Sequence, residues 1–283
     1  MAESEPAAIE TVATRGVELV CERSGEGTPI VLTHGLTATR RYVTHGSRLL
    51  ERSGFDVLSY DARGHGESSP APERSAYEYA DLVADLEAVL DHAGLDSAVL
   101  AGASMGAATA LAFTLEHPAR VRALVQITPA HFGIAQRNPE ELARWDALAE
   151  GLERDGVDGF MRAYGVPNVE ERFRGLVLKA IRQRIERHRH PQAVADALRV
   201  VPRSNAWEGG LEELEHVTVP TLIVGSRDDL DPEHALSIAE AYAERIPNAE
   251  LVVEEPGSSP LAWRGAQLSR AIIGFVQRAG VTA

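Results

Sequence analysis

Short apolar runs alternate along the chain with longer stretches whose apolar residues recur at helical spacing. The runs lie at 30–32, 56–60, 97–103, 123–127, 221–224 and 250–253. Runs of this length between turn residues are typical of strands buried in a parallel sheet. Among the helical stretches, residues 77–92 carry Leu82, Leu86, Val89 and Leu90 on one face. The alternation predicts an α/β fold, doubly wound, with helices on both faces of a mostly parallel sheet.

Two further strands are predicted near the start of the chain. Residues 9–14 and 17–23 flank Arg15-Gly16, which is typical of a hairpin turn. With this hairpin the predicted sheet has eight strands. We also expect helices from Leu36 to about Arg52, from Met105, over 234–245 and over about 261–279.

Residues 132–216 interrupt the alternation, because they contain helix signals but no convincing strand. Helix starts are predicted at Asn138-Pro139, near Asn168 and at Pro191. A helical insertion of this size between two strands indicates a lid or cap over the edge where the strands end. The expected organisation is a core over 1–131 and 217–283 with a helical cap over 132–216.

Composition and charge narrow the class of protein. The 283 residues are 44% hydrophobic with a mean hydropathy of −0.16, and no apolar run is long enough to cross a membrane. The single cysteine, Cys21, excludes an internal disulfide, and the acidic start lacks the features of a signal peptide. We therefore expect a cytoplasmic protein. The net charge of −14 disfavours nucleic acid as a partner.

Positive charge is concentrated in residues 171–203, which hold nine Arg or Lys against three Asp or Glu. We interpret four of the arginines as a solvated helix face. These are Arg182, Arg184, Arg187 and Arg189. His188 and His190 lie among them, but no converging carboxylate or third imidazole is identified for a metal site. We expect no metal and no cofactor.

The most specific pattern is Gly102-x-Ser104-x-Gly106, between the run at 97–103 and the helix predicted from Met105. A strand that reverses into a helix within two residues leaves its pivot strained, and glycines are needed where the backbones crowd together. The pivot is Ser104, whose hydroxyl should stand clear at the carboxyl end of the strand. The helix then directs N–H groups and a positive dipole at the same point, which suits a developing oxyanion. This predicts a nucleophilic serine; the alternative is a buried serine in a glycine-rich turn.

Three other motifs accompany the serine motif in a specific order. They are Thr33-His34-Gly35-Leu36, Asp61-x-Arg63-Gly64-His65-Gly66-x-Ser68 and Gly225-x-x-Asp228-x-x-x-Pro232. On these motifs the chain resembles the α/β-hydrolase fold family, over essentially its full core. The resemblance implies a capped, esterase-like serine hydrolase in which Ser104 is the nucleophile and the N–H groups of Leu36 and Met105 bind the oxyanion. It also implies that Asp228 orients the base, with Asp229 and Asp231 as local competitors.

The chain departs from the family at the general base. After the last strand the family usually has histidine, and Ser258 occupies that position here; no histidine follows His234. A serine hydroxyl does not accept and return a proton near neutral pH, and removing a triad histidine costs roughly 10⁶-fold in turnover in a serine protease. Either another residue is the base, or hydrolysis is slow, or the site binds without turnover. An engineered substitution is a further alternative.

Three other histidines are candidates for a substitute base or for the pocket. His131 follows the strand at 123–127, His34 lies in the oxyanion loop, and His65 lies in the loop after 56–60. For each of them a role in ordering a loop is the competing interpretation.

Two functions are compatible with these residues. The first is a serine hydrolase with an incomplete triad, acting on a small or medium carboxylic ester or related acyl compound. The second is a non-hydrolytic or weakly active protein that binds a small molecule, as a sensor, a receptor or in another reaction. Intact Ser104, Asp228 and oxyanion loop favour the enzyme, and Ser258 favours the binding protein. Either way the expected partner is a small acyl or ester-type molecule, and the oligomeric state stays open.

Overall fold

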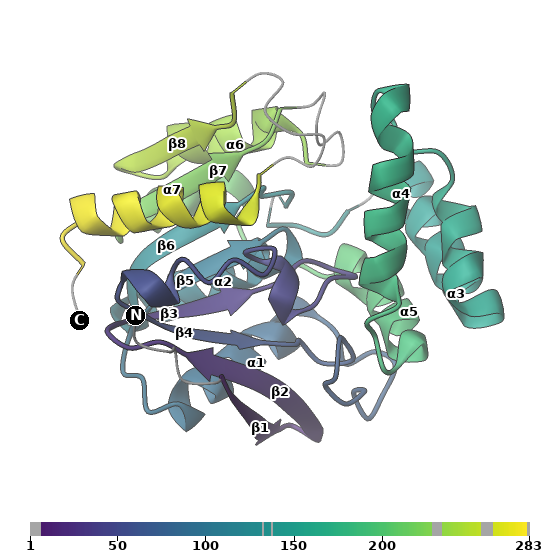
Figure 1. Cartoon of the computed structure of the whole chain (residues 1–283), viewed down its shortest axis with the longest axis horizontal. Helices are drawn as coiled ribbons and strands as arrows, with labels where there is room; N and C mark the ends of the chain where they lie inside the picture. Colours follow the sequence, from purple (N-terminus) through teal and green to yellow (C-terminus); the bar gives the residue numbers. More distant parts are fainter. Residues whose placement is uncertain (1–6, 132, 137, 228–233, 256–262, 282–283) are drawn as a thin grey trace.

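The computed structural model describes residues 7–131, 133–136, 138–227, 234–255 and 263–281. Its sheet has eight strands in the order β1-β2-β4-β3-β5-β6-β7-β8 (Figure 1). The strands are β1 (Ala8–Thr14), β2 (Val17–Ser24), β3 (Thr28–Thr33), β4 (Phe55–Tyr60), β5 (Ala98–Ala103), β6 (Val121–Ile127), β7 (Thr221–Gly225) and β8 (Ala249–Val253). β2 pairs antiparallel with β1 and β4, and the remaining neighbours pair parallel. This confirms the predicted eight-stranded, mostly parallel sheet.

Helices cover both faces of the sheet. The helices of the core are α1 (Tyr79–His92), α2 (Met105–Glu116), α6 (Leu236–Arg245) and α7 (Gly265–Arg278), with a 3₁₀ turn η3 (Pro118–Arg120) after α2. Side chains of α1, α2 and α6 pack in one apolar cluster, and those of α7 pack in a second cluster on the opposite face (Figure 1). β3 is buried along its whole length, as a strand covered on both faces requires.

One predicted helix of the core is wrong. The residues from Leu36 to Arg52 form no α-helix, and only two short 3₁₀ turns occur there, η1 (Arg40–Tyr42) and η2 (Glu51–Ser53). Thr37 and His45 have φ values of 68° and 48°. A right-handed helix needs φ near −60°, so both residues interrupt it.

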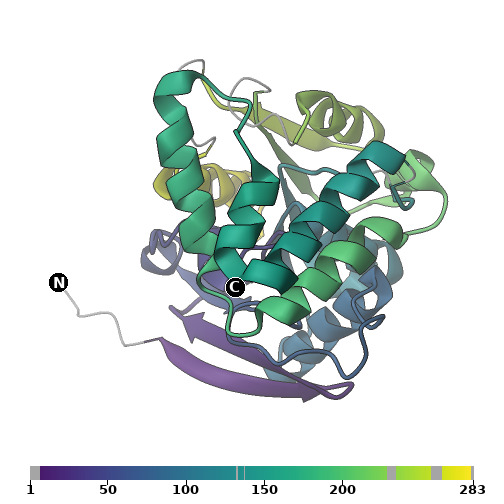
Figure 2. The ribbon, with the colours of Figure 1, turned by 90° about the vertical axis from the view of Figure 1, so that its right-hand side faces the viewer.

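Between β6 and β7, the described residues form helices and no strand. The elements are α3 (Pro139–Tyr164), α4 (Glu171–Ile185), α5 (Pro191–Val200), η4 (Val201–Arg203) and η5 (Gly210–His216). We refer to residues 139–216 as the helical insertion; Figure 2 views its helices face on. The Asn138 side chain accepts the N–H of Glu140, as its helix-start pattern predicts, whereas α4 begins at Glu171 and not at Asn168.

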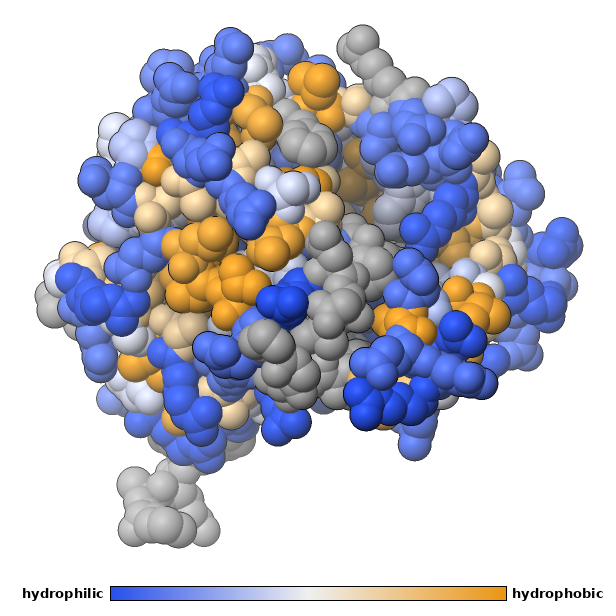
Figure 3. Space-filling model, turned by 90° about the horizontal axis from the view of Figure 1, so that it is seen from above, coloured by the Kyte–Doolittle hydropathy of each residue, from blue (hydrophilic) through white to orange (hydrophobic). Residues whose placement is uncertain are grey.

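The parallel register brings the carboxyl ends of the central strands to one edge. Ala103 pairs with Ile127, Ile127 with Val224, and Val224 with Val252. The arrows of β3, β4 and β5 point toward the helical insertion in Figure 1. Seen from the β8 side, the right-hand part of the molecule is mostly hydrophilic, and the largest group of apolar side chains lies left of centre on the same face (Figure 3). The carboxyl ends of β3, β4 and β5 therefore lie on the side of the sheet that faces the insertion.

Candidate active site

Ser104 forms the junction between β5 and α2. Its φ is 51° and its ψ is −112°, a conformation that L-residues rarely adopt. Its N–H donates to the carbonyl of Ile127 at 3.0 Å, and its carbonyl accepts the N–H of Ala108 at 3.0 Å. The residue is half-buried, whereas Met105 is buried. The strained strand-to-helix turn that the sequence predicts is therefore present.

Three glycines make this turn possible. A Cβ atom on Gly102 would lie 2.2 Å from the carbonyl oxygen of Gly106, and one on Gly106 would lie 2.3 Å from that of Thr33. On Gly35 it would lie 3.3 Å from the Cβ of Ser104. The loop after β3 thus runs directly beside the serine.

Two backbone N–H groups are available next to Ser104. Leu36 follows Gly35, and Met105 is the first residue of α2. Within the described residues, neither N–H donates a hydrogen bond to another backbone or side-chain group. Free N–H groups at a helix start and in an adjacent loop suit an oxyanion.

Left-handed residues other than glycine gather at this edge of the sheet. Thr37 (φ 68°), Ser104 (φ 51°) and Thr128 (φ 43°) lie after β3, β5 and β6. A positive φ is especially unfavourable for threonine, because its Cβ is branched. Such strain collects at functional sites, where the surrounding structure holds it.

Three histidines, from the loops after β3 and β4 and from the turn between α4 and α5, have their rings in contact. The ring centroids of His34 and His65 are 5.2 Å apart, and those of His65 and His188 are 5.5 Å apart. His34 Nε2 accepts the N–H of Ala62 at 2.9 Å, so its Nδ1 donates to the Gly35 carbonyl at 2.8 Å. Burial lowers the pKa of both His34 and His188 to about 3, and it also lowers the pKa of His65.

His188 belongs to the helical insertion and joins it to the core. Its Nδ1 accepts the N–H of Gly66 at 2.9 Å, and its Nε2 donates to the carbonyl of Thr37 at 2.9 Å. His65 Nδ1 donates to the Arg63 carbonyl at 2.9 Å, and its Nε2 is buried without a hydrogen-bond partner in the described part of the chain. These rings order loops, and the sequence carried no signal that His188, in a run of arginines, would be buried.

His131 is not part of the cluster formed by His34, His65 and His188. Its Nδ1 accepts the N–H of Gly133 at 2.9 Å, which leaves the proton on Nε2. Its ring packs between Tyr79 and Trp207, with centroids 5.0 Å and 5.7 Å away. Burial lowers its pKa to about 4. In this tautomer neither ring nitrogen has a lone pair free to accept the proton of a serine.

The charged residues of the motif from Asp61 to Ser68 form buried ion pairs that stabilise the loop. Arg63 is 1% exposed and donates from Nε and one Nη to the two carboxylate oxygens of Asp85, each at 2.7 Å. Asp61 is fully buried and accepts from the side chain and the N–H of Arg40. Ser68 donates to the Asp61 carbonyl at 2.6 Å. These bonds fix the loop that carries His65.

Asp228 and Ser258, together with Asp229 and Asp231, lie outside the described residues. The residues next to them contain a carboxylate that the sequence analysis overlooked. Glu254 follows β8, is 3% exposed and accepts the N–H of Arg227 through Oε1 at 3.0 Å. Its buried Oε2 has no hydrogen-bond partner among the described residues. A buried acid at this point ties the start of the Asp228 loop to the end of β8.

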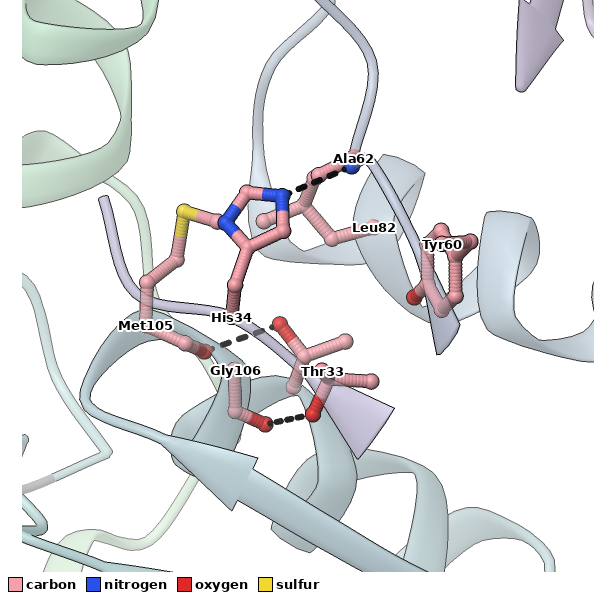
Figure 4. Close-up of a pocket in the computed structure, with 8 residues that line it drawn as sticks. Thr33, His34, Tyr60, Ala62, Leu82, Met105 and Gly106 are labelled. Carbon is pink, nitrogen blue, oxygen red and sulfur yellow. Dashed lines mark hydrogen bonds between the residues drawn. The ribbon is translucent and has the colours of Figure 1, made fainter. Parts of the chain in front are cut away.

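A small cavity lies next to the loop after β3. Its walls are formed by Thr33, His34, Tyr60, Ala62, Leu82, Met105, Gly106 and Thr109 (Figure 4). Its volume of about 10 Å³ is at the lower limit for a single water molecule. It is a packing defect behind Met105 and not a substrate pocket. Among the described residues no group of three His, Cys, Asp or Glu side chains could hold a metal ion.

Residues 28–263 match the family model of the alpha/beta hydrolase fold, so the chain belongs to that family. Non-heme chloroperoxidase CPO-A1 of Kitasatospora aureofaciens is 26% identical over 272 residues, which cover 87% of this chain and 90% of that protein. Epoxide hydrolase A of Mycobacterium tuberculosis is 35% identical over 135 residues, 47% of this chain and 42% of that one. A malate-bound thermophilic esterase from Thermogutta terrifontis has a TM-score of 0.78 and 26% identity, over 96% of this chain and 99% of its own.

These relatives are hydrolase-fold enzymes that catalyse different reactions. They indicate the class of enzyme but no particular substrate. No helix in the described ranges is long and apolar enough to cross a membrane.

Proposed function

We propose that this chain is a serine hydrolase acting on a small or medium carboxylic ester or related acyl compound. The observation that carries the proposal is the left-handed Ser104 between β5 and α2, beside Gly35. In the proposed reaction Ser104 Oγ attacks the carbonyl carbon, and the N–H groups of Leu36 and Met105 stabilise the negative charge on the carbonyl oxygen. The alcohol then leaves, and water hydrolyses the acyl-serine.

The proposed triad is incomplete. Asp228 takes the role of the orienting acid, and Ser258 takes the position of the base within a side chain's reach of both Ser104 and Asp228. Residues 132–216 act as a cap over Ser104, between the core segments 1–131 and 217–283. Because neither Ser258 nor the hydrogen-bonded His34 and His131 supplies a good base, the proton of Ser104 passes to water and turnover is slow.

Covalent labelling tests the nucleophile. We expect a fluorophosphonate probe to label the protein, and Ser104→Ala to abolish both the labelling and the hydrolysis of a panel of activated esters. Equal labelling of Ser104→Ala and the wild type would refute the proposal.

The second candidate function is small-molecule binding without turnover, or a non-hydrolytic reaction. It is favoured by the hydrogen bonds that engage the rings of His34, His131 and His188. A ligand that stabilises the protein against heat without being consumed, in a protein that no ester acylates, would support this alternative.

A further inference from the structure

Several arginines of the helical insertion form ion pairs with carboxylates. Examples are Arg172–Glu170 at 2.9 Å, Arg182–Asp158 at 2.7 Å, Arg199–Glu153 at 2.6 Å and Arg203–Asp146 at 2.8 Å. Arg184 differs from them. Its guanidinium makes no hydrogen bond and no ion pair with any residue in the described ranges.

Arg184 is also partly removed from solvent. It lies on α4 between the buried residues Ile181 and Ile185, and its side chain is half-buried. Its Nε is shielded from solvent and lacks an acceptor. An unpaired donor that is shielded from water is costly, so an acceptor is expected at this point. The helix face that the sequence predicts as solvated is therefore only partly exposed at Arg184.

Arg184 lies next to Ile185, at the end of α4 whose apolar cluster packs against Leu36 of the loop after β3. Its positive charge acts on His188, from the insertion, and on His45, from the loop after β3. His188 in turn bonds to the carbonyl of Thr37, two residues after the Gly35 that lies beside Ser104. Leu36 packs against the apolar cluster of the insertion and against that of the core. The seam between the insertion and the loop after β3 therefore combines the apolar side chain of Leu36, the polar contacts of His188 and the guanidinium of Arg184, whose Nε is shielded and unpaired.

We propose that Arg184 binds a carboxylate at the far end of the substrate. This inference rests on the proposed function and refines its substrate class to half-esters of dicarboxylic acids, or similar acyl compounds with one remote carboxylate. A planar guanidinium pairs with a carboxylate through two parallel hydrogen bonds. One arginine without further donors suits a monoanion better than a phosphate. The net charge of the chain, −14, repels anions, so a local cation is needed to admit one.

Matched ester pairs test the inference. The substrates are mono-4-nitrophenyl esters of succinic, glutaric, adipic and suberic acid, each compared with its neutral methyl 4-nitrophenyl diester. We expect the wild type to prefer the charged member at one chain length. Arg184→Gln should lower the ratio of the two kcat/KM values by about 10- to 100-fold, as expected for a hydrogen bond to a charged group. Arg184→Lys should retain part of the preference.

Arg182→Gln is the matched control, because Arg182 lies on the same helix and pairs with Asp158. It should keep the wild-type ratio. An unchanged ratio in Arg184→Gln, or no preference in the wild type, would overturn the inference.

Binding separates this inference from the proposed function. Calorimetry with monomethyl adipate is carried out on Ser104→Ala, alone and combined with Arg184→Gln or Arg182→Gln. Weaker binding only with Arg184→Gln supports the carboxylate site even where no ester is hydrolysed. Equal binding by all three proteins, or binding by none, contradicts it while leaving the role of Ser104 to the labelling experiment.

Discussion

Ser104, Thr37 and Thr128 hold backbone conformations that cost of order 1–3 kcal/mol each. Ser104 is kept in place because its N–H and carbonyl are bonded to β6 and to α2. Its neighbours Gly102 and Gly106 admit no side chain. The strained position is thus determined from several sides at once, which is the preorganisation that the proposed role of Ser104 needs.

At the same scale, introducing a histidine tests whether Ser258 occupies the position of the general base. We expect Ser258→His to raise ester turnover by at least about 10²-fold, the usual contribution of a positioned general base. Ser259→His and Pro260→His scan the neighbouring registers. Each rate is measured with and without Ser104→Ala, which should remove the gain. Fast hydrolysis by the wild type that is lost in His131→Ala would instead indicate a relocated base.

The Arg63–Asp85 pair allows a second test at the level of residues. Arg63→Met leaves the Asp85 carboxylate buried without its partner, so we expect a loss of about 3–5 kcal/mol in the free energy of unfolding. The double variant Arg63→Met/Asp85→Leu should recover most of the loss, because apolar side chains replace both charges. Urea unfolding of Arg63→Met, Asp85→Leu and the double variant measures the coupling free energy between the two side chains. Additive losses would show that the pair is not a unit.

At the scale of elements, α3 is two helices joined at a kink at Asp155 and Gly156. Gly151 and Gly159 face each other across it, and a Cβ on Gly159 would lie 1.9 Å from the Gly151 carbonyl oxygen. We expect Gly159→Ala to destabilise the protein by about 1–3 kcal/mol through overpacking. Gly175→Ala in α4 should instead stabilise the protein by about 0.5–1 kcal/mol, because nothing lies within 4 Å of the added Cβ. Thermal unfolding of both variants tests these two expectations. A change in stability of the same sign in both variants would contradict them.

The elements that the sequence predicts well are those decided by local pattern. The Arg15-Gly16 hairpin turn has positive φ at both residues (42° and 77°), as the tight turn needs. Buried strands and the Asn138-Pro139 helix start also follow from short-range chemistry. The region after Leu36 could not be predicted in this way, because Gly35 packs beside Ser104 and Thr37 is bonded to His188, and both partners are remote in sequence. The burial of His188 and Arg184 likewise depends on how the insertion meets the core.

At the scale of the whole molecule, the helical insertion and the core are joined by buried polar contacts. His188 bridges Gly66 and Thr37, and the N–H of Arg189 donates to the Gly66 carbonyl at 2.8 Å. Leu36 supplies an apolar contact at the same seam. The loop next to Ser104 is therefore held by the insertion, so loosening the seam should affect both stability and the site.

The pH dependence of stability tests this seam. Burial lowers the pKa of His34 and His188 to about 3 and that of His131 to about 4, against 6.5 in the unfolded chain. Below pH 6.5 the unfolded chain binds these protons and the folded chain does not, so stability falls on acidification from about pH 6.5 toward 3. Each such histidine contributes a slope of up to about 1.4 kcal/mol per pH unit. Between pH 6.5 and 5 carboxylates titrate little, so this window isolates the histidines.

Between pH 6.5 and 5 we expect the stability of His188→Gln to change less steeply with pH than that of the wild type. The difference in slope should equal the contribution of one histidine. The amide can still accept from Gly66 or donate to Thr37, so the variant removes the titrating group while keeping part of the bridge. His216→Gln is the control, because the His216 side chain is 71% exposed, and it should retain the wild-type slope. Urea unfolding at a series of pH values from 7 to 5 measures all three proteins. A wild-type slope in His188→Gln would mean that the seam opens before the protein unfolds, so that His188 is already hydrated when it is protonated.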